Sequence, residues 1–161
     1  MKTIEKTRKI GIETARFGRL EADPASFISF NEGVYGFPQA RNFLLIETAK
    51  AGDFRWLQSV EDPALAFLVT DPTLFYPDFR GRVDREHPLL AALADDYQLL
   101  AIVTVERPTR GVTVNLAAPL AVHATRREGR QLILAQGDLL TAHDLVKDYR
   151  ALLARTLQGK V

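Results

Sequence analysis

Hydrophobic and β-branched residues in this chain gather in short runs, and turn-forming residues separate the runs. Their length and alternation predict strands rather than helices. Separators such as "ADPAS", "EGVYGFP", "EDPA", "TDP" and "ERPTRG" are rich in the Pro, Gly and Asp that turns use. The predicted strands span residues 10–17, 27–30, 43–47, 54–60, 65–70, 99–105, 111–116, 119–124 and 131–135. This pattern predicts a mainly β fold, a small antiparallel β-barrel or sandwich.

Two segments carry the four-residue spacing of a helix instead. In "HPLLAALADDYQLL" the residues Leu89, Leu93 and Tyr97 lie four apart, which predicts a short helix over about 88–97 with Pro88 in its first turn. A second apolar stripe predicts a C-terminal helix over about 141–157. An apolar stripe is most often core, so packing on the chain's own barrel is favoured over docking on another molecule.

A third local pattern, "ATRREGRQLIL", predicts a hairpin with Glu128-Gly129 at its tip, where glycine would supply a positive φ.

The 161 residues fit one domain, with a barrel over about 10–135 and a helical extension over about 138–161. The chain contains no cysteine, which excludes thiol nucleophiles, disulfides and thiolate metal sites. Its N-terminus lacks the apolar run of a secretory signal, and no run approaches the length of a membrane span. We therefore expect a cytoplasmic protein that does not bind membranes.

The net charge of +1, from 21 basic and 20 acidic residues, does not favour nucleic acid as a partner. The charges are unevenly distributed, however. No Lys or Arg lies between Arg55 and Arg80, and this stretch contains four separate acidic residues: Glu61, Asp62, Asp71 and Asp78. It is the best candidate for an acidic surface.

Residues typical of catalysis do not form a recognisable constellation. The three histidines, His87, His123 and His143, fall in different predicted elements without metal-ligand spacing. Ser59 lacks the surroundings of a nucleophile elbow, and neighbouring carboxylates such as Asp95 and Asp96 usually point apart. We expect no catalytic residue, no metal and no cofactor.

Several stretches in order resemble one protein family. They are "ISFNEGVYGFPQARNFLLIE" (28–47), "RWLQSVEDPALAFLVTDP" (55–72), "TVNLAAPLAVH" (113–123) and "GRQLIL" (129–134). The chain resembles the flagellar assembly factor FliW family. The resemblance implies a β-barrel-like domain without enzymatic activity and two protein partners, flagellin and the RNA-binding regulator CsrA. In that family FliW keeps CsrA from repressing flagellin translation, and new flagellin competes for FliW. The chain would be a monomer or weak homo-oligomer without direct nucleic-acid contact.

The resemblance and the charge pattern together select candidate partner-binding residues. A basic RNA-binding protein would be attracted by acidic surface, which selects Glu61, Asp62, Asp71 and Asp78. Flagellin's amphipathic terminal segments would need an exposed apolar groove, for which Tyr35 and Phe37 are candidate anchors.

The remaining motif residues have predicted structural roles. Gly33 and Gly36 serve loop geometry, and Trp56 and Leu57 alternate across a strand, with the tryptophan expected in the core. Gln58 is expected to bond neighbouring backbone. Two further residues concern strand ends: Asn115 fixes one through its side-chain amide, and Pro119 starts the next strand or places it at a sheet edge.

Two alternatives remain open at this point. One is an RNA-binding module that uses the arginines of the hairpin, Arg126, Arg127 and Arg130, although no aromatic residues are interleaved with them. The other is a small-molecule-binding barrel, which requires a deep apolar pocket with convergent polar groups. The sequence does not decide whether the two partner sites overlap, or what the C-terminal helix does.

Overall fold

A computed structural model describes residues 8–48, 53–105, 111–135 and 143–144 of the chain. The strands are β1 (Ile10–Thr14), β2 (Gly18–Ala22), β3 (Ile28–Phe30), β4 (Asn42–Glu47), β5 (Phe54–Ser59), β6 (Ala66–Thr70), β7 (Tyr97–Val105), β8 (Val112–Val114), β9 (Leu120–His123), β10 (Glu128–Gln131) and β11 (His143–Asp144). The helices are η1 (Pro24–Ser26), η2 (Pro72–Leu74), α1 (Phe79–Glu86), α2 (Pro88–Ala91) and η3 (Ala94–Asp96). The fold is mainly β, as predicted.

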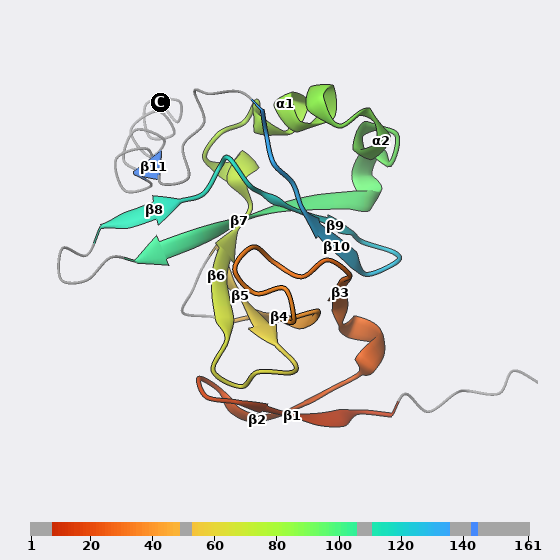
Figure 1. Cartoon of the computed structure of the whole chain (residues 1–161), viewed down its shortest axis with the longest axis vertical. Helices are drawn as coiled ribbons and strands as arrows, with labels where there is room; N and C mark the ends of the chain where they lie inside the picture. The colour runs from red at the N-terminus through yellow and green to blue at the C-terminus, as the bar shows by residue number, and fades with distance from the viewer. Residues whose placement is uncertain (1–7, 49–52, 106–110, 136–142, 145–161) are drawn as a thin grey trace, which may run out of the picture.

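The central sheet closes into a barrel (Figure 1). Around it the strands follow the order β7-β6-β5-β4-β3-β10-β9, and a pairing between β9 and β7 completes the circle. Only the β10–β3 pairing is parallel among the described strands. Closure depends on β7, whose first half pairs with β9 and whose second half pairs with β6 and β8. The prediction of a small antiparallel barrel is confirmed.

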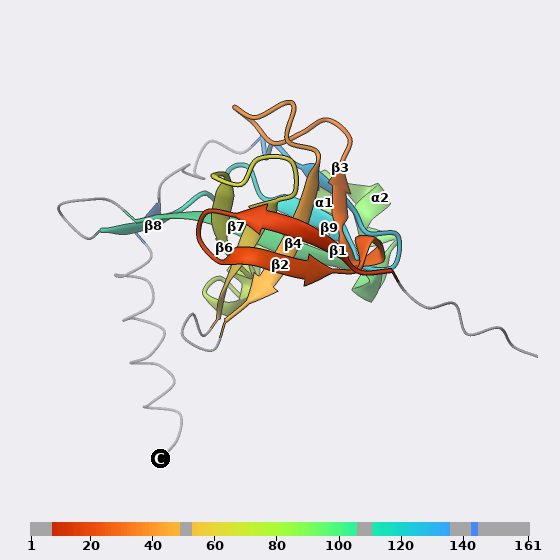
Figure 2. The same ribbon diagram turned by 90° about the horizontal axis from the view of Figure 1, so that it is seen from below.

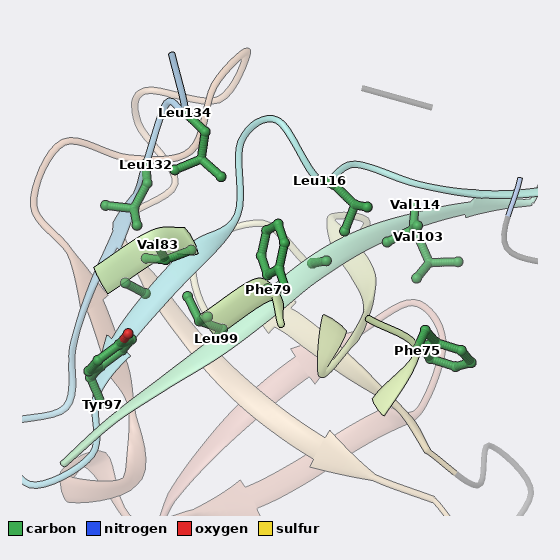
Figure 3. Packing of buried hydrophobic residues seen from close by; sticks show 12 residues of the cluster. Phe75, Phe79, Val83, Tyr97, Leu99, Val103, Val114, Leu116, Leu132 and Leu134 are labelled. Carbon is green, nitrogen blue, oxygen red and sulfur yellow. The ribbon is translucent and has the colours of Figure 1, made fainter. Parts of the chain in front are cut away.

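Strand β7 is buried on both faces, which explains its nearly continuous apolar sequence. Leu100 joins the cluster inside the barrel, together with Ile28, Phe30, Phe43 and Leu57. The alternate residues of β7 face outward into a second cluster, which α1 covers with Phe79 and Val83 (Figure 3). The chain thus has one core inside the barrel and one beneath its helical cover.

Strands β1 and β2 form a separate hairpin across one end of the barrel (Figure 2). The sequence predicted one strand over 10–17, and this was wrong because the chain reverses over residues 15–17. Strand β1 ends at Thr14, and Gly18, with a φ of 69°, already begins β2. The turn docks on the barrel through a hydrogen bond from Ala15 N to Pro63 O of 2.8 Å.

The helix predicted over 88–97 was also wrong in extent. The α-helix α2 ends at Ala91, and Tyr97 already begins strand β7. Leu89, which the spacing placed on one helical face with Leu93 and Tyr97, is 87% exposed. The helix α1 was missed, because Gly81 and several charged residues leave only Phe79 and Val83 as buried positions.

The hairpin tip predicted at Glu128-Gly129 lies earlier, in the turn between β9 and β10, where Arg127 has the positive φ of 55°. Gly129 is inside β10, because the ring of Phe30 covers it: an added Cβ would lie 2.4 Å from Phe30 Cζ. The strand predicted over 131–135 accordingly starts and ends earlier, at 128 and 131.

The predicted C-terminal helix over 141–157 falls largely outside the described residues. Within that range His143–Asp144 form the short strand β11, which pairs with β8.

Candidate functional site

The loop between β5 and β6 is organised by the buried amide of Gln58, a side chain with no exposed surface. Gln58 Nε2 donates to Ser59 O at 3.0 Å and to Leu65 O at 3.1 Å, and lies 3.4 Å from Asp62 O and 3.3 Å from Pro63 O. The expectation that Gln58 bonds neighbouring backbone is confirmed. The motif "RWLQSVEDP" therefore gives its loop a fixed conformation.

Within this loop Glu61 and Asp62 are exposed but held in place. Glu61 Oε1 accepts hydrogen bonds from the backbone N of Asn42 at 3.0 Å and from its side-chain Nδ2 at 2.9 Å. Asp62 Oδ1 accepts from Ala64 N at 3.0 Å, and Ser59 Oγ accepts from Asp62 N at 3.0 Å. Both carboxylates have defined positions and remain accessible to a partner.

A second loop, residues 31–40, lies beside the first. Gly33 and Gly36 have φ values of 70° and 85°, which confirms that they serve loop geometry. Between them the chain makes a tight turn closed by a hydrogen bond from Phe37 N to Val34 O of 2.7 Å. Tyr35 stands at the tip and is 63% exposed, and its backbone N donates to Gln131 Oε1 at 2.8 Å.

Phe37 extends from this loop and is 42% exposed. Its ring meets the ring of Phe67 edge-on, with centroids 5.4 Å apart. The ring centroid of Phe67 lies 6.0 Å from that of Phe43, and the ring centroid of Phe43 lies 5.4 Å from that of Phe30. Phe37 is thus the exposed end of an aromatic row that reaches into the barrel core, so packing fixes its position.

The two loops enclose a groove of about 540 Å³, called the acidic groove below. It is lined by Gly36, Phe37, Pro38, Gln39, Ala40, Ser59, Glu61, Asp62 and Leu65. The structure thereby brings together three predicted residues, Phe37, Glu61 and Asp62. No Lys or Arg is among the described residues that line it. The groove offers an aromatic anchor beside two carboxylates.

Asp71 and Asp78 lie away from the acidic groove. Since β5 and β6 are antiparallel, Asp71 follows the end of β6 opposite the 60–65 loop. Its Oδ1 accepts from Thr73 N at 2.9 Å and caps η2, and it lines a pocket of about 170 Å³ with Arg55 and Arg80. Asp78 is exposed at the start of α1 without a side-chain capping bond. The stretch without Lys and Arg is therefore split between two ends of the barrel.

Trp56 is only half-buried and lies outside both core clusters, so its expected core position was wrong. The ring centroid of Phe17, in the β1–β2 hairpin, lies 6.4 Å from that of Trp56, and the guanidinium carbon of Arg16 lies 3.8 Å from the Trp56 ring centroid. Leu57, its strand neighbour, is fully buried inside the barrel. Trp56 thus anchors the hairpin.

Asn115 and Pro119 occupy the connection before β9. Asn115 directly follows β8, and the oxygen of its side-chain amide accepts a hydrogen bond from Ala118 N at 3.0 Å, which confirms its predicted role at a strand end. Pro119 immediately precedes β9, a strand paired on both sides. The first of the two expectations for Pro119 therefore holds.

Neither a metal site nor a catalytic cluster is found among the described residues. Over residues 8–48, 53–105, 111–135 and 143–144, no group of three His, Asp or Glu side chains could hold a metal ion. His123 Nε2 lies 3.5 Å from Asp96 Oδ2, and His87 lines the same cleft as His123. Burial, followed by a hydrogen bond with Asp84, raises the pKa of Tyr97 to about 12, so this phenol stays protonated.

No described helix is long and apolar enough to cross a membrane.

The arginines of the β9–β10 turn are partly engaged in the fold. Arg127 donates from Nη2 to Ser26 O at 2.9 Å. Arg130 Nε lies 4.0 Å from Glu32 Oε2, and Arg126 is exposed. An RNA-binding surface would have only part of this cluster available.

Sequence reasoning missed Asn42, Ser59 and Leu65 as parts of the site. The signal for Asn42 was its position at the start of β4, since pairing of β4 with β5 sets it next to the loop that follows β5: Val60 N donates to Asn42 O at 2.9 Å. No local pattern indicated that Glu61 would be its partner.

Comparison with known proteins is consistent across sequence and structure. The model of the family described as "FliW protein" matches residues 9–145. The chain is 40% identical over 132 residues to flagellar assembly factor FliW of Syntrophotalea carbinolica, covering 81% of this chain and 94% of that protein. It is 40% identical over 121 residues to flagellar assembly factor FliW 2 of Desulfotalea psychrophila, covering 74% and 80%. A crystal structure of the flagellar assembly factor FliW superposes with a TM-score of 0.73 at 31% identity, covering 84% of this chain and 96% of the other.

Proposed function

The chain belongs to the FliW family of flagellar assembly factors, and from this we propose that it is a non-enzymatic cytoplasmic protein that binds flagellin and sequesters a CsrA-type RNA-binding regulator. Sequestration would relieve repression of flagellin translation. Flagellin binding would compete with it, because a ligand that lowers the affinity for a second ligand has its own affinity lowered by the same factor.

The acidic groove carries the proposal for the regulator. Any protein that binds RNA must present basic surface to phosphate, and Glu61 and Asp62 face solvent beside Phe37 in a groove whose described lining contains no Lys or Arg. Such a groove attracts a basic protein and repels RNA itself. Phe37 adds the aromatic contact on which protein interfaces commonly depend.

The test is co-purification with the regulator and the flagellin of the same organism, followed by titration of each partner. We compare the wild type with the double variant Glu61→Gln and Asp62→Asn, which removes two charges while keeping acceptors for Asn42 and Ala64. Affinity for the regulator should fall about tenfold or more. The matched control Asp78→Asn removes an exposed charge that lies outside the groove.

The outcomes separate the parts of the proposal. If neither protein binds at micromolar concentration, the proposed function is wrong. If both bind but the double variant matches Asp78→Asn, the acidic groove is not the regulator site. Salt-dependent binding of RNA by the chain alone would favour the RNA-binding alternative instead.

A further inference from the structure

A second cleft, of about 470 Å³, lies on the other side of the 31–40 loop, between α2 and the β9–β10 hairpin. Its apolar lining is aliphatic: Leu89, Leu90, Leu93, Ala121 and Leu132. We call it the leucine cleft. Its size is within the range of about 300–1,000 Å³ that is usual for ligand sites. It shares no lining residue with the acidic groove.

Leu89 at this cleft is unusual because it is 87% exposed. It belongs to the short helix α2, which Pro88 begins, so the side chain is presented on a defined element. A small molecule within the cleft would leave most of this side chain in water. A protein segment lying across the cleft would bury it along with the leucines inside, which favours association.

The charges at the cleft indicate the character of that segment. Three carboxylates, Glu32, Glu86 and Glu128, line the cleft together with one guanidinium, Arg130, and the imidazoles of His87 and His123. Glu86 Oε1 accepts a hydrogen bond from Ala135 N, whereas Glu32 and Glu128 are exposed. The Arg130–Glu32 contact of 4.0 Å joins two side chains that are 72% and 80% exposed, so it neutralises little of this charge. The excess of carboxylates favours a partner with Lys or Arg beside its apolar residues.

We propose that the leucine cleft is a docking site for a protein segment that presents aliphatic side chains flanked by basic residues. The site is additional to the acidic groove and does not depend on the two partners named above. It gives the chain two separate binding surfaces, both bordered by the 31–40 loop.

The test uses synthetic helical peptides and the full chain. One fluorescent peptide carries leucines at i, i+3, i+4 and i+7 with lysine flanks, a second carries glutamate flanks, and a third is a scrambled lysine version without an apolar face. We expect the lysine–leucine peptide to bind the wild type at least about tenfold tighter than the other two. Leu89→Glu should weaken that binding about tenfold or more, because it places a charge in the apolar contact.

Leu74→Glu is the matched control, since Leu74 is also an exposed leucine, at 44%, but does not line the cleft. It should leave peptide binding unchanged, and circular dichroism should show both variants folded. Equal binding by wild type and Leu89→Glu, or equal binding of the three peptides, would overturn the proposal. So would sedimentation showing a dimer that Leu89→Glu dissociates, because a second copy would then be the occupant. Regulator binding that survives Leu89→Glu leaves the proposed function intact whatever the peptides do.

Discussion

The conformation of the 60–65 loop should depend on Gln58, and Gln58→Met tests this with little change in side-chain volume. The amide is oriented unambiguously: the carbonyl oxygens around Nε2 would repel Oε1 if the amide were turned. In the variant two hydrogen bonds are lost, and carbonyl groups near the buried position face a thioether, which together cost about 3–4 kcal/mol. Removal of Oε1, which has no hydrogen-bond partner among the described residues, offsets about 1 kcal/mol.

The net loss of about 2–3 kcal/mol corresponds to a decrease in Tm of about 5–10 °C for a chain of this length. Thermal unfolding followed by circular dichroism measures it, with Gln98→Met as the control at an exposed glutamine. Hydrogen exchange of the 59–65 amides should also become faster than in the wild type, while exchange in β7 changes less. Regulator affinity should fall with the loss of loop order. If Gln58→Met unfolds within about 1 °C of Gln98→Met with unchanged exchange in this loop, the role assigned to Gln58 is wrong.

Three further changes test other contacts. Gly129→Ala should lower the free energy of unfolding by about 1–3 kcal/mol, measured in urea, because its Cβ would overlap the ring of Phe30. The free energy of unfolding should decline between pH 10 and about 12, because the unfolded chain releases the Tyr97 proton at lower pH than folded Tyr97, whose pKa is about 12. Unfolding measured across this pH range should show that Tyr97→Phe lacks this part of the decline. Phe17→Ala should shift the emission of Trp56, the only tryptophan, to longer wavelength as the hairpin cover loosens.

Most strands were predictable because each is a short run of apolar and β-branched residues bounded by turn-forming residues. Strand β7 was found as well, although both of its faces are buried. The errors occur where tertiary contacts override a local pattern. Tyr97 and Leu93 have helical spacing, yet Tyr97 pairs with His123 in the barrel and so belongs to a strand. Gly129 looks like a turn residue but is required by the Phe30 ring above it.

The acidic groove was predictable in its components and not in its assembly. Phe37, Glu61 and Asp62 were selected one by one from exposure, charge and motif. They meet because β4 and β5 are antiparallel, so the loop before β4 lies beside the loop after β5, with Phe43 opposite Ser59. The sequence could not separate these acids from Asp71, since charge patterning treats 56–79 as one segment whereas β6 carries Asp71 to the opposite end.

The position of the 31–40 loop connects the two clefts. Gly33 lines the leucine cleft, and Gly36 and Phe37 line the acidic groove. The space beside Gly33 is filled by Phe37 O and the Pro38 backbone, each 2.7 Å from where a Cβ would lie, so the two ends of the loop are in direct contact. A ligand that displaced the backbone at Phe37 would therefore also shift Gly33 in the wall of the leucine cleft. Any resulting change in affinity must be reciprocal, and competition between two partners then requires no overlap of their footprints.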